Sequence, residues 1–298
     1  MGEETNYFEL LVTWLETHRT VNLLLILLYF VFIYFMHDPI VHLSIWVMNS
    51  MSLPVYNKVV KAISILLLIL FTVFIGGQIK QYGNNLWLKI MYLLLTIGLI
   101  IAHFCTMFEM NIEVIHVFEY PFLTLLIFPL TKRFGAAVLF TIPFMLMDEW
   151  HQYIVLYPSY VDYFEFNDVM IDIYGCGLAM VALLVCGVRG QIPVKPIWKR
   201  AEFVSLAVAL LALAIAIKTC FFSIYEPDKC SNTWLVLYRV HEPITFWRKF
   251  PGRDVVYHVM QPVEAFFAIT GLALFYFGLD SFRKESTQTY TNSIPSGK

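Results

Sequence analysis

The chain has 298 residues, of which 59% are hydrophobic and 14% are charged, and its formal net charge is -2. Soluble domains carry about 25% charged residues, so this composition excludes an ordinary soluble protein. It predicts an all-α, polytopic helix bundle whose main partner is the lipid bilayer. Without a basic arm or a glycine-rich phosphate loop, the sequence also excludes a nucleic-acid-binding protein.

Apolar runs long enough to cross a bilayer recur along the chain. About 20 apolar residues span a bilayer, and by that measure the sequence predicts about eight spanning helices. Their ranges are 21–36, 60–78, 86–105, 112–130, 134–152, 168–188, 202–222 and 258–279. The acidic residues 1–17 are not typical of a cleavable signal peptide. Met36-His37-Asp38-Pro39 is expected to end the first helix, and residues 40–57 are expected to be interfacial or re-entrant.

Lysine and arginine are concentrated in alternate connections between these helices. Lys132 and Arg133 lie in the fourth connection and Arg189 in the sixth, whereas the third and fifth connections contain neither residue type. Short cytoplasmic loops are enriched in Lys and Arg. The alternation therefore predicts a multi-pass protein of the cell membrane with both termini in the cytoplasm; Lys58 and Lys61, in the first outer connection, are exceptions.

The five cysteines are too few for a disulfide framework. Cys105, Cys176 and Cys186 lie in or beside apolar runs and are expected to be packing residues. Cys220 and Cys230 flank the start of the long outer connection. If that connection lies outside the cytoplasm, a disulfide between them is one of two open outcomes.

Three of the apolar helices carry polar residues near the same end. Asp148 lies roughly 22 Å along its helix from Arg133, and His116 and Asp172 lie at nearly the same distance from the basic residues that follow their own helices. The hydrocarbon core is about 30 Å thick. All three polar groups are therefore expected just inside its outer edge, where ionised side chains are costly and usually functional.

The spacing of these residues gives each helix a polar stripe, because residues four apart share one helix face. The pairs are His116 with Tyr120, Asp148 with Gln152, and Asp168 with Asp172. Facing one another, the stripes can pair; Glu149 and His151 are expected to project elsewhere, toward the interface. Gly175 and Gly177 are expected to allow a neighbouring helix to pack closely. The candidate functional residues are His116, Glu119, Tyr120, Asp148, Glu149, Gln152, Asp168 and Asp172.

Three segments carry these residues in order: His116-Val-Phe-Glu-Tyr120, Asp148-Glu149-Trp-His-Gln152 and Asp168-Val-Met-Ile-Asp172-Ile-Tyr-Gly175. They resemble the VanZ-like family of membrane proteins, which has a His with a Tyr four later, an Asp-Glu-x-x-Gln and an Asp-x-x-x-Asn-x-x-Gly. The resemblance implies a four-helix core at 90–188, between regions 1–89 and 189–298 with two spanning helices each. It also implies a cell-envelope ligand, lipid-linked or peptide, and a link to glycopeptide antibiotic resistance.

Two positions depart from the family pattern. Asp172 stands where the family usually has Asn, and the Arg that the family tends to have before the third segment has no counterpart between Trp150 and Val188. The excess of negative charge therefore requires a cation or protonated carboxyl groups. The long outer loop is aromatic and basic, and it either lies on lipid headgroups or caps the site and supplies the missing Arg. Its residues of this kind are His241, Glu242, Trp247, Arg248, Lys249 and Arg253.

Three functions stay open at this point. The first is an envelope protein that binds its ligand without chemistry. The second is a metal-dependent, membrane-embedded hydrolase or transferase with a bound water as nucleophile; its candidate ligands for zinc or manganese are His116, Asp148, Asp168 and Asp172. The third is a cation- or proton-coupled transporter, which the clustering at one face disfavours.

Three further histidines are candidates for additional metal ligands at the same site. His103, His151 and His258 would have to join His116 to give a histidine-rich metal site. His258, Gln261 and Glu264 open the last helix. They are interpreted as an ordinary helix start, and an accessory face of the site is the alternative.

Overall fold

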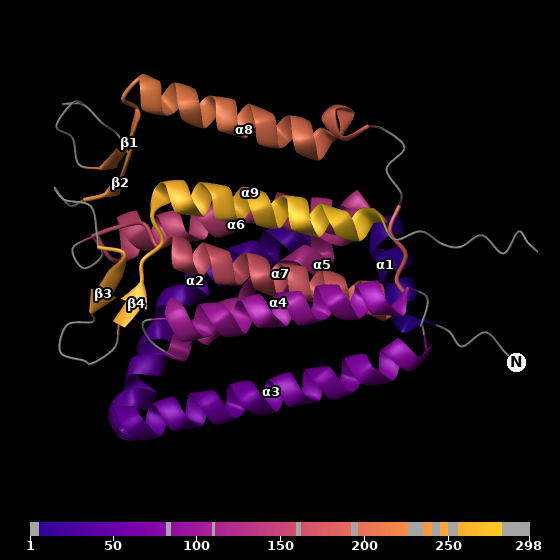
Figure 1. Ribbon diagram of the computed structural model, residues 1–298, viewed down its shortest axis with the longest axis horizontal. Coiled ribbons are helices and arrows are strands. Elements are labelled where there is room, and N and C mark those ends of the chain that lie inside the picture. The colour runs from indigo at the N-terminus through magenta and orange to yellow at the C-terminus, as the bar shows by residue number, and fades with distance from the viewer. Residues whose placement is uncertain are drawn as a thin grey trace, which may run out of the picture.

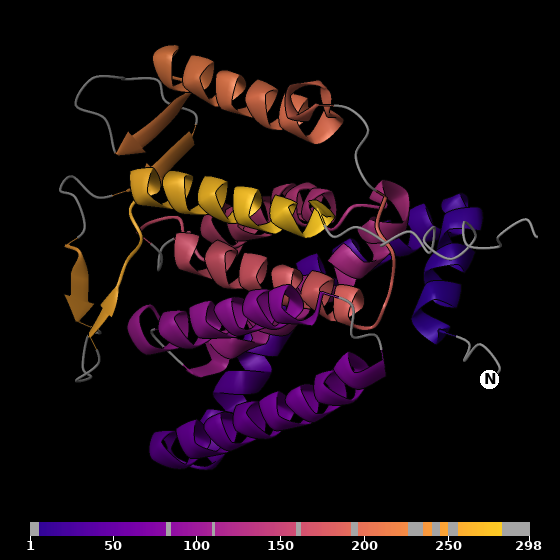
Figure 2. The ribbon, with the colours of Figure 1, turned by 45° about the vertical axis from the view of Figure 1, so that its right-hand side comes forward.

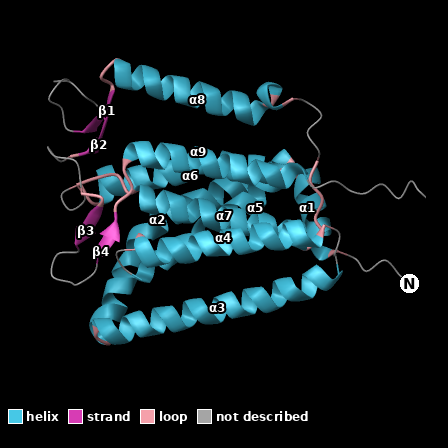
Figure 3. Cartoon of the chain, in the orientation of Figure 1, coloured by secondary structure: helices cyan, strands magenta, loops and turns pink. Residues whose placement is uncertain are grey.

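The structure is a computed structural model that describes residues 6–81, 85–108, 111–158, 162–191, 196–225, 235–239, 245–249 and 256–281. Within these ranges the chain forms a bundle of α-helices with short strands at one end (Figures 1 and 3). The helices are α1 (Tyr7–Thr17), α2 (Arg19–Ser50), α3 (Leu53–Gln81), α4 (Leu86–Thr106), α5 (His116–Thr131), α6 (Phe134–His151), α7 (Phe166–Val185), α8 (Ala201–Lys218) and α9 (Pro262–Phe277).

The described residues contain seven helical segments that are long and apolar enough to cross a membrane. They correspond to α2, α3, α4, α5, α7, α8 and α9, and α6 packs among them. The chain is therefore a multi-pass membrane protein, and the predicted all-α bundle is confirmed.

The centre of the bundle is α7, and α4, α5, α6 and α9 pack around it (Figures 1 and 2). Two glycines of α7 allow neighbouring helices to approach it closely. A Cβ atom on Gly175 would lie 2.4 Å from the carbonyl oxygen of Val117, and one on Gly177 would lie 2.2 Å from the hydroxyl of Tyr276. No side chain fits at either distance, so the predicted close packing at both glycines is confirmed.

The helices α3 and α8 stand at the periphery of the bundle (Figure 1). Only 6% of the most apolar window of each is buried, against 83% for α7. Their exposed side chains are predominantly large and apolar, for example Leu66 and Ile69 on α3 and Leu211 on α8. These surfaces suit contact with lipid tails.

The N-terminal part differs from the prediction. Helix α2 does not end at Met36–Pro39 but continues through Pro39 to Ser50, and α3 begins at Leu53. Residues 40–57 are therefore not a separate interfacial or re-entrant segment. Proline removes one helix hydrogen bond, and membrane helices tolerate that loss when the surroundings satisfy the freed group. The short helix α1, capped by the Asn6 side chain on the amides of Phe8 and Glu9, was also not predicted.

Short strands replace part of the long loop that the sequence predicts after α8. Parallel strands β1 (Phe222–Tyr225) and β2 (Leu235–Tyr238) form one pair, and antiparallel strands β3 (Trp247–Lys249) and β4 (Val256–His258) form another. Both pairs lie at the end of the bundle opposite α1 (Figure 1). We call this the strand-bearing end.

The cysteines divide as the sequence suggested, with one exception. Cys220, just before β1, is in a disulfide, and its candidate partner Cys230 lies outside the described residues. Cys176 and Cys186 are free and buried, as packing residues should be. Cys105 is free but exposed, so the expectation that it packs in the core is wrong.

Ion pairs join basic residues to acidic partners at the end of the bundle that carries α1. Lys132 pairs with Glu16, and Arg133 makes a two-pronged contact with the buried carboxylate of Glu202. Arg189 lies 4.0 Å from Glu9 on α1. The basic residues that set the predicted orientation thus gather at one end, away from the strands.

Candidate functional site

Four consecutive elements bring the predicted polar residues to the strand-bearing end of the bundle. The first turns of α5 carry His116, Glu119 and Tyr120, and the last turn of α6 carries Asp148 and Glu149. Gln152 opens a single π-helical turn, Gln152–Leu156, that follows α6. The first turns of α7 carry Asp168 and Asp172. These eight residues line up at the same end because α5 and α7 begin there and α6 ends there.

His116 is the centre of this group. Its Nε2 lies 3.4 Å from Oδ2 of Asp168, and its Nδ1 lies 3.3 Å from both Oδ1 of Asp172 and Oε2 of Glu119. The histidine is 4% exposed and Asp172 is 1% exposed. The predicted stripes of α5 and α7 therefore face each other, and Gly175 permits the close approach that this requires.

Gln152 joins the acidic pair of α6. Its amide Nε2 donates to Oδ2 of Asp148 at 3.3 Å and to Oε1 of Glu149 at 3.1 Å. Glu149 is 3% exposed, so the expectation that it projects toward the interface is wrong. Several helices surround the end of α6, and adjacent positions about 100° apart on it can both face the cluster. His151 lies off the cluster and stacks on Tyr34, with ring centroids 3.8 Å apart.

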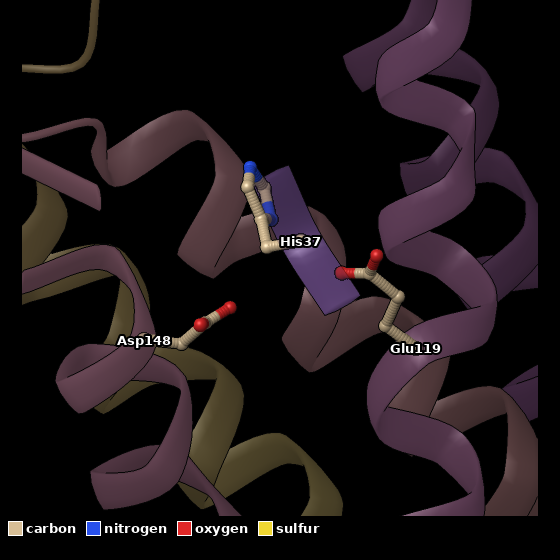
Figure 4. Close-up of side chains that lie close together, drawn as sticks. All are labelled: His37, Glu119 and Asp148. Atoms are coloured by element: carbon tan, nitrogen blue, oxygen red, sulfur yellow. The ribbon is translucent and has the colours of Figure 1, made fainter. Parts of the chain in front are cut away.

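A histidine from α2 completes the group, and the sequence analysis missed it. The ring of His37 is buried, and its centroid lies 6.1 Å from that of His116. Figure 4 shows the carboxylates of Asp148 and Glu119 pointing toward one another, with the His37 ring beside the space between them. The sequence feature that indicates this position is the apolar run that resumes after Pro39. It indicates that the helix continues past Pro39 and therefore that His37 lies inside the helix.

We call His37, His116, Glu119, Asp148, Glu149, Asp168 and Asp172 the acid–histidine cluster. Its ligand atoms form three groups in which all atoms lie within 4.8 Å of one another. The groups are His37, Glu119 and Asp148; His116, Glu149 and Asp168; and His116, Glu119 and Asp172. Mixed nitrogen and oxygen ligands of this kind suit zinc or manganese.

The carboxylates of the cluster have few partners within the protein. In the described part of the chain, their ion pairs are all made with His116. Oδ1 of Asp148 and Oδ1 of Asp168 are buried and have no hydrogen-bond partner among the described residues. Buried carboxylate oxygens without partners are strongly destabilising. The chemistry of the cluster therefore fits a bound cation, which would satisfy these oxygens.

The cluster lies at one end of a cavity of about 740 Å³. The lining includes His37, His116, Glu119 and Asp168 from the cluster. From His37 the cavity follows α2 to Met48, roughly 16 Å at the rise of a helix, past apolar side chains. The apolar side chains that line the cavity are Ile40, Val41, Ile45 and Met48 on α2, Leu53 on α3, Phe104 on α4 and Phe108 just after α4. The cavity is thus polar at the cluster and mainly apolar along α2, with Ser44 on α2 and Asn57 and Lys61 on α3 as polar residues in its lining.

Tyrosines and basic residues lie on the side of the cavity nearest the strands. Tyr153 and Tyr163 line it. The guanidinium carbon of Arg239 lies 4.2 Å from the centre of the Tyr153 ring, and that of Arg248 lies 5.3 Å from the centre of the Tyr163 ring. Arg248 thus reaches a wall of the cavity. Among the described residues it makes no ion pair with the cluster carboxylates. Arg253 of the same loop lies outside the described residues, so an arginine supplied by this loop stays a prediction.

The other candidate histidines have separate environments. Nε2 of His258 lies 3.0 Å from Glu264, and Gln261 with Glu264 forms a capping box at the start of α9. The interpretation of these residues as a helix start is confirmed. His103 is buried in edge-to-face contact with the rings of Phe108 and Tyr174. Neither histidine belongs to the three groups found among the described residues.

Comparison of the chain with known protein families, with characterised proteins and with solved structures gives no match. The resemblance to the VanZ-like family therefore stays a prediction that rests on the three segments named above.

Proposed function

We propose that the chain is a metal-dependent, membrane-embedded hydrolase or transferase that acts on an amphiphilic substrate. One observation carries this proposal: residues of the acid–histidine cluster line a cavity whose walls along α2 are mainly apolar. The cluster is suited to a divalent ion and a polar reacting group, and the apolar walls are suited to a lipid chain.

The chemistry follows from the ligand types. A divalent ion bound by imidazole and carboxylates supplies an activated water close to neutral pH. A cluster carboxylate that did not bind the ion would accept the proton of that water. As the water oxygen bonds to the carbonyl carbon or phosphorus of the substrate and the bond to the leaving group breaks, that carboxyl group would return the proton to the leaving group. Gln152 holds Asp148 and Glu149 in place during these steps.

The cavity indicates the kind of substrate. Its volume of about 740 Å³ falls in the usual range of small-molecule sites, about 300–1,000 Å³. A polar head at His116 and a lipid chain along Ile40, Ile45 and Met48 would use both of its surfaces. A lipid-linked precursor of the cell envelope, the ligand that the VanZ-like resemblance implies, has these two parts.

The proposal places the site on the side of the cell membrane away from the cytosol. Lys132, Arg133 and Arg189 lie at the opposite end of the bundle from the strands, and such residues favour the cytoplasmic side. Cys220, at the strand-bearing end, is in a disulfide, which is typical of an oxidising compartment. Both termini then lie in the cytoplasm.

The proposed function is tested with detergent-purified full-length protein, Zn²⁺ or Mn²⁺, and a panel of amphiphiles. The panel contains lipid pyrophosphates, phospholipids, acyl esters and acyl amides, and mass spectrometry detects the products. We expect turnover of one class by the wild type, and none after chelation by EDTA or in the Asp168→Asn variant. Asp280→Asn, which changes a buried carboxylate outside the cluster, should keep the activity.

Two results would contradict the proposal. Turnover that persists in EDTA and in Asp168→Asn would place the reaction elsewhere. Thermal stabilisation of the protein by lipid-linked precursors, with no product from any member of the panel, would favour the ligand-binding function instead.

A further inference from the structure

We infer that the acid–histidine cluster holds two divalent ions, each bound by one histidine and two carboxylates. This inference rests on the proposed metal-dependent function and goes beyond it, because that function requires only one ion.

Three ligand sets compete for the ions. The first set is His37, Glu119 and Asp148, and the second set is His116, Glu149 and Asp168. These two sets have no residue in common, so both can be filled at once. The central set, His116 with Glu119 and Asp172, shares one residue with each of the others. The cluster therefore holds either two ions in the first and second sets, or one ion in the central set with the outer sets incomplete.

His116 can bind the ion of the second set through Nε2 and keep Nδ1–H for a carboxylate acceptor. Its Nε2 lies 3.4 Å from Oδ2 of Asp168, a spacing that two ligands of one ion have. Binding through Nε2 leaves Nδ1–H 3.3 Å from both Oδ1 of Asp172 and Oε2 of Glu119, and Glu119 is a ligand of the first set, so Asp172 is the carboxylate left to accept from it. A carboxylate that accepts a hydrogen bond from a metal-binding histidine is the usual outer partner of such a ligand. Asp172 is then a positioning residue for His116 and not a metal ligand.

The first and second sets adjoin each other. Oε2 of Glu119, in the first set, lies 3.3 Å from Nδ1 of His116, in the second. Gln152 donates to Asp148 of the first set and to Glu149 of the second. Two-metal enzymes hold their ions about 3.5–4 Å apart, and helix bundles build such centres from carboxylates and histidines on facing helices.

Charge and unpartnered atoms support two ions independently. The cluster has five carboxylates, Glu119, Asp148, Glu149, Asp168 and Asp172, which bring five negative charges when ionised. One divalent ion would leave three of these charges uncompensated, and two ions would leave one; uncompensated buried charge is destabilising. Among the described residues, four buried carboxylate oxygens of the cluster have no hydrogen-bond partner: Oε2 of Glu119, Oδ1 of Asp148, Oδ1 of Asp168 and Oδ1 of Asp172. One ion in the central set would leave the oxygens of Asp148 and Asp168 unsatisfied.

The test is a Mn²⁺ titration of full-length protein that has been stripped of metal in detergent. Elemental analysis counts the bound ions, and electron paramagnetic resonance detects the coupling between two neighbouring Mn²⁺ ions. We expect two ions and a coupled spectrum for the wild type. Asp148→Asn and Asp168→Asn should each bind one ion with an uncoupled spectrum.

Two variants serve as controls. Asp172→Asn should still bind two ions at saturation, with the affinity of the second set about 10–100-fold weaker because His116 has lost its positioning partner. Asp280→Asn, outside the cluster, should match the wild type. If an asparagine variant aggregates, His37→Gln and Glu149→Gln remove one ligand from the first and second sets and carry the same expectations.

A single bound ion in the wild type would overturn the inference and leave the metal-dependent function standing. Its loss in Asp172→Asn, with retention in Asp148→Asn and Asp168→Asn, would assign that ion to the central set. A wild type that binds no ion would contradict the inference and the proposed function together.

Discussion

Asp168 and His116 face each other across the contact between α5 and α7, with Oδ2 of one 3.4 Å from Nε2 of the other. Both residues lie in the first turn of their helices, and the helices approach closely because Gly175 lies against the carbonyl of Val117. The distance between the two functional groups therefore depends on a residue that has no side chain. This dependence leads to the first prediction.

Gly175→Ala should destabilise the protein and weaken metal binding together. The added Cβ would lie 2.4 Å from the oxygen of Val117, so α5 and α7 must separate, and overpacking of this kind costs about 1–3 kcal/mol. The thermal midpoint in detergent reports the first effect, and Mn²⁺ titration reports the second. The matched control is Gly271→Ala on α9, where an added Cβ has no neighbour within 4 Å. Equal effects of the two substitutions would contradict this account of the helix contact.

Glu202→Gln should lower the thermal midpoint strongly. Arg133 donates to both carboxylate oxygens of Glu202, whose side chain is 1% exposed, and breaking a buried pair costs about 3–5 kcal/mol. Glu9→Gln is the comparison, because Glu9 and its partner Arg189 are 41% and 65% exposed. Exposed pairs contribute about 0–1 kcal/mol, so this variant should unfold close to the wild type. A loss in Glu9→Gln as large as that in Glu202→Gln would refute the prediction.

Removal of metal should lower the thermal midpoint of the wild type. A ligand that binds only the folded state stabilises it by about 2.7 kcal/mol at 100 times its dissociation constant, and EDTA abolishes this contribution. In Asp168→Asn the shift on addition of EDTA should be smaller than in the wild type, because one set has lost a ligand. The measurement is a pair of unfolding curves with and without EDTA for each protein. Identical shifts in the two proteins would speak against Asp168 as a ligand.

The disulfide at Cys220 should be reached from outside the cell. In a Cys105→Ser background, a membrane-impermeant maleimide should label intact cells only after treatment with an impermeant reductant. Cys186, buried at the end of α7 away from the strands, should react only after the protein is solubilised and denatured. Labelling after reduction that requires permeabilised cells would reverse the proposed orientation.

Two regularities of the α-helix allow the sequence to predict that the polar residues of α5, α6 and α7 lie together. Residues four apart share a helix face, which paired Asp168 with Asp172. A rise of about 1.5 Å per residue then placed His116, Asp148 and Asp172 at one depth. Neither regularity depends on how the helices are arranged around one another, so both hold before the fold is known.

The residues that were missed or misplaced depend on that arrangement. His37 was assigned to a helix end because His-Asp-Pro usually stops a helix, but the apolar run after Pro39 keeps α2 in the membrane. The spacing of Asp148 and Gln152 predicts a single polar face on α6 and therefore an interfacial Glu149, whereas the cluster is surrounded by α2, α5, α6 and α7. The strands after α8 are three or four residues long, too short for a period-2 pattern to predict them.

The most direct test of the metal site is the metal content of the double variant His116→Gln/Glu119→Gln beside that of the wild type. These two substitutions take a ligand from each of the three groups. After loading with Mn²⁺ or Zn²⁺ and removal of the excess, the wild type and Asp280→Asn should retain the ion in stoichiometric amount and the double variant should retain none. Equal metal content in the double variant and the wild type would contradict the assignment of the cluster as a metal site.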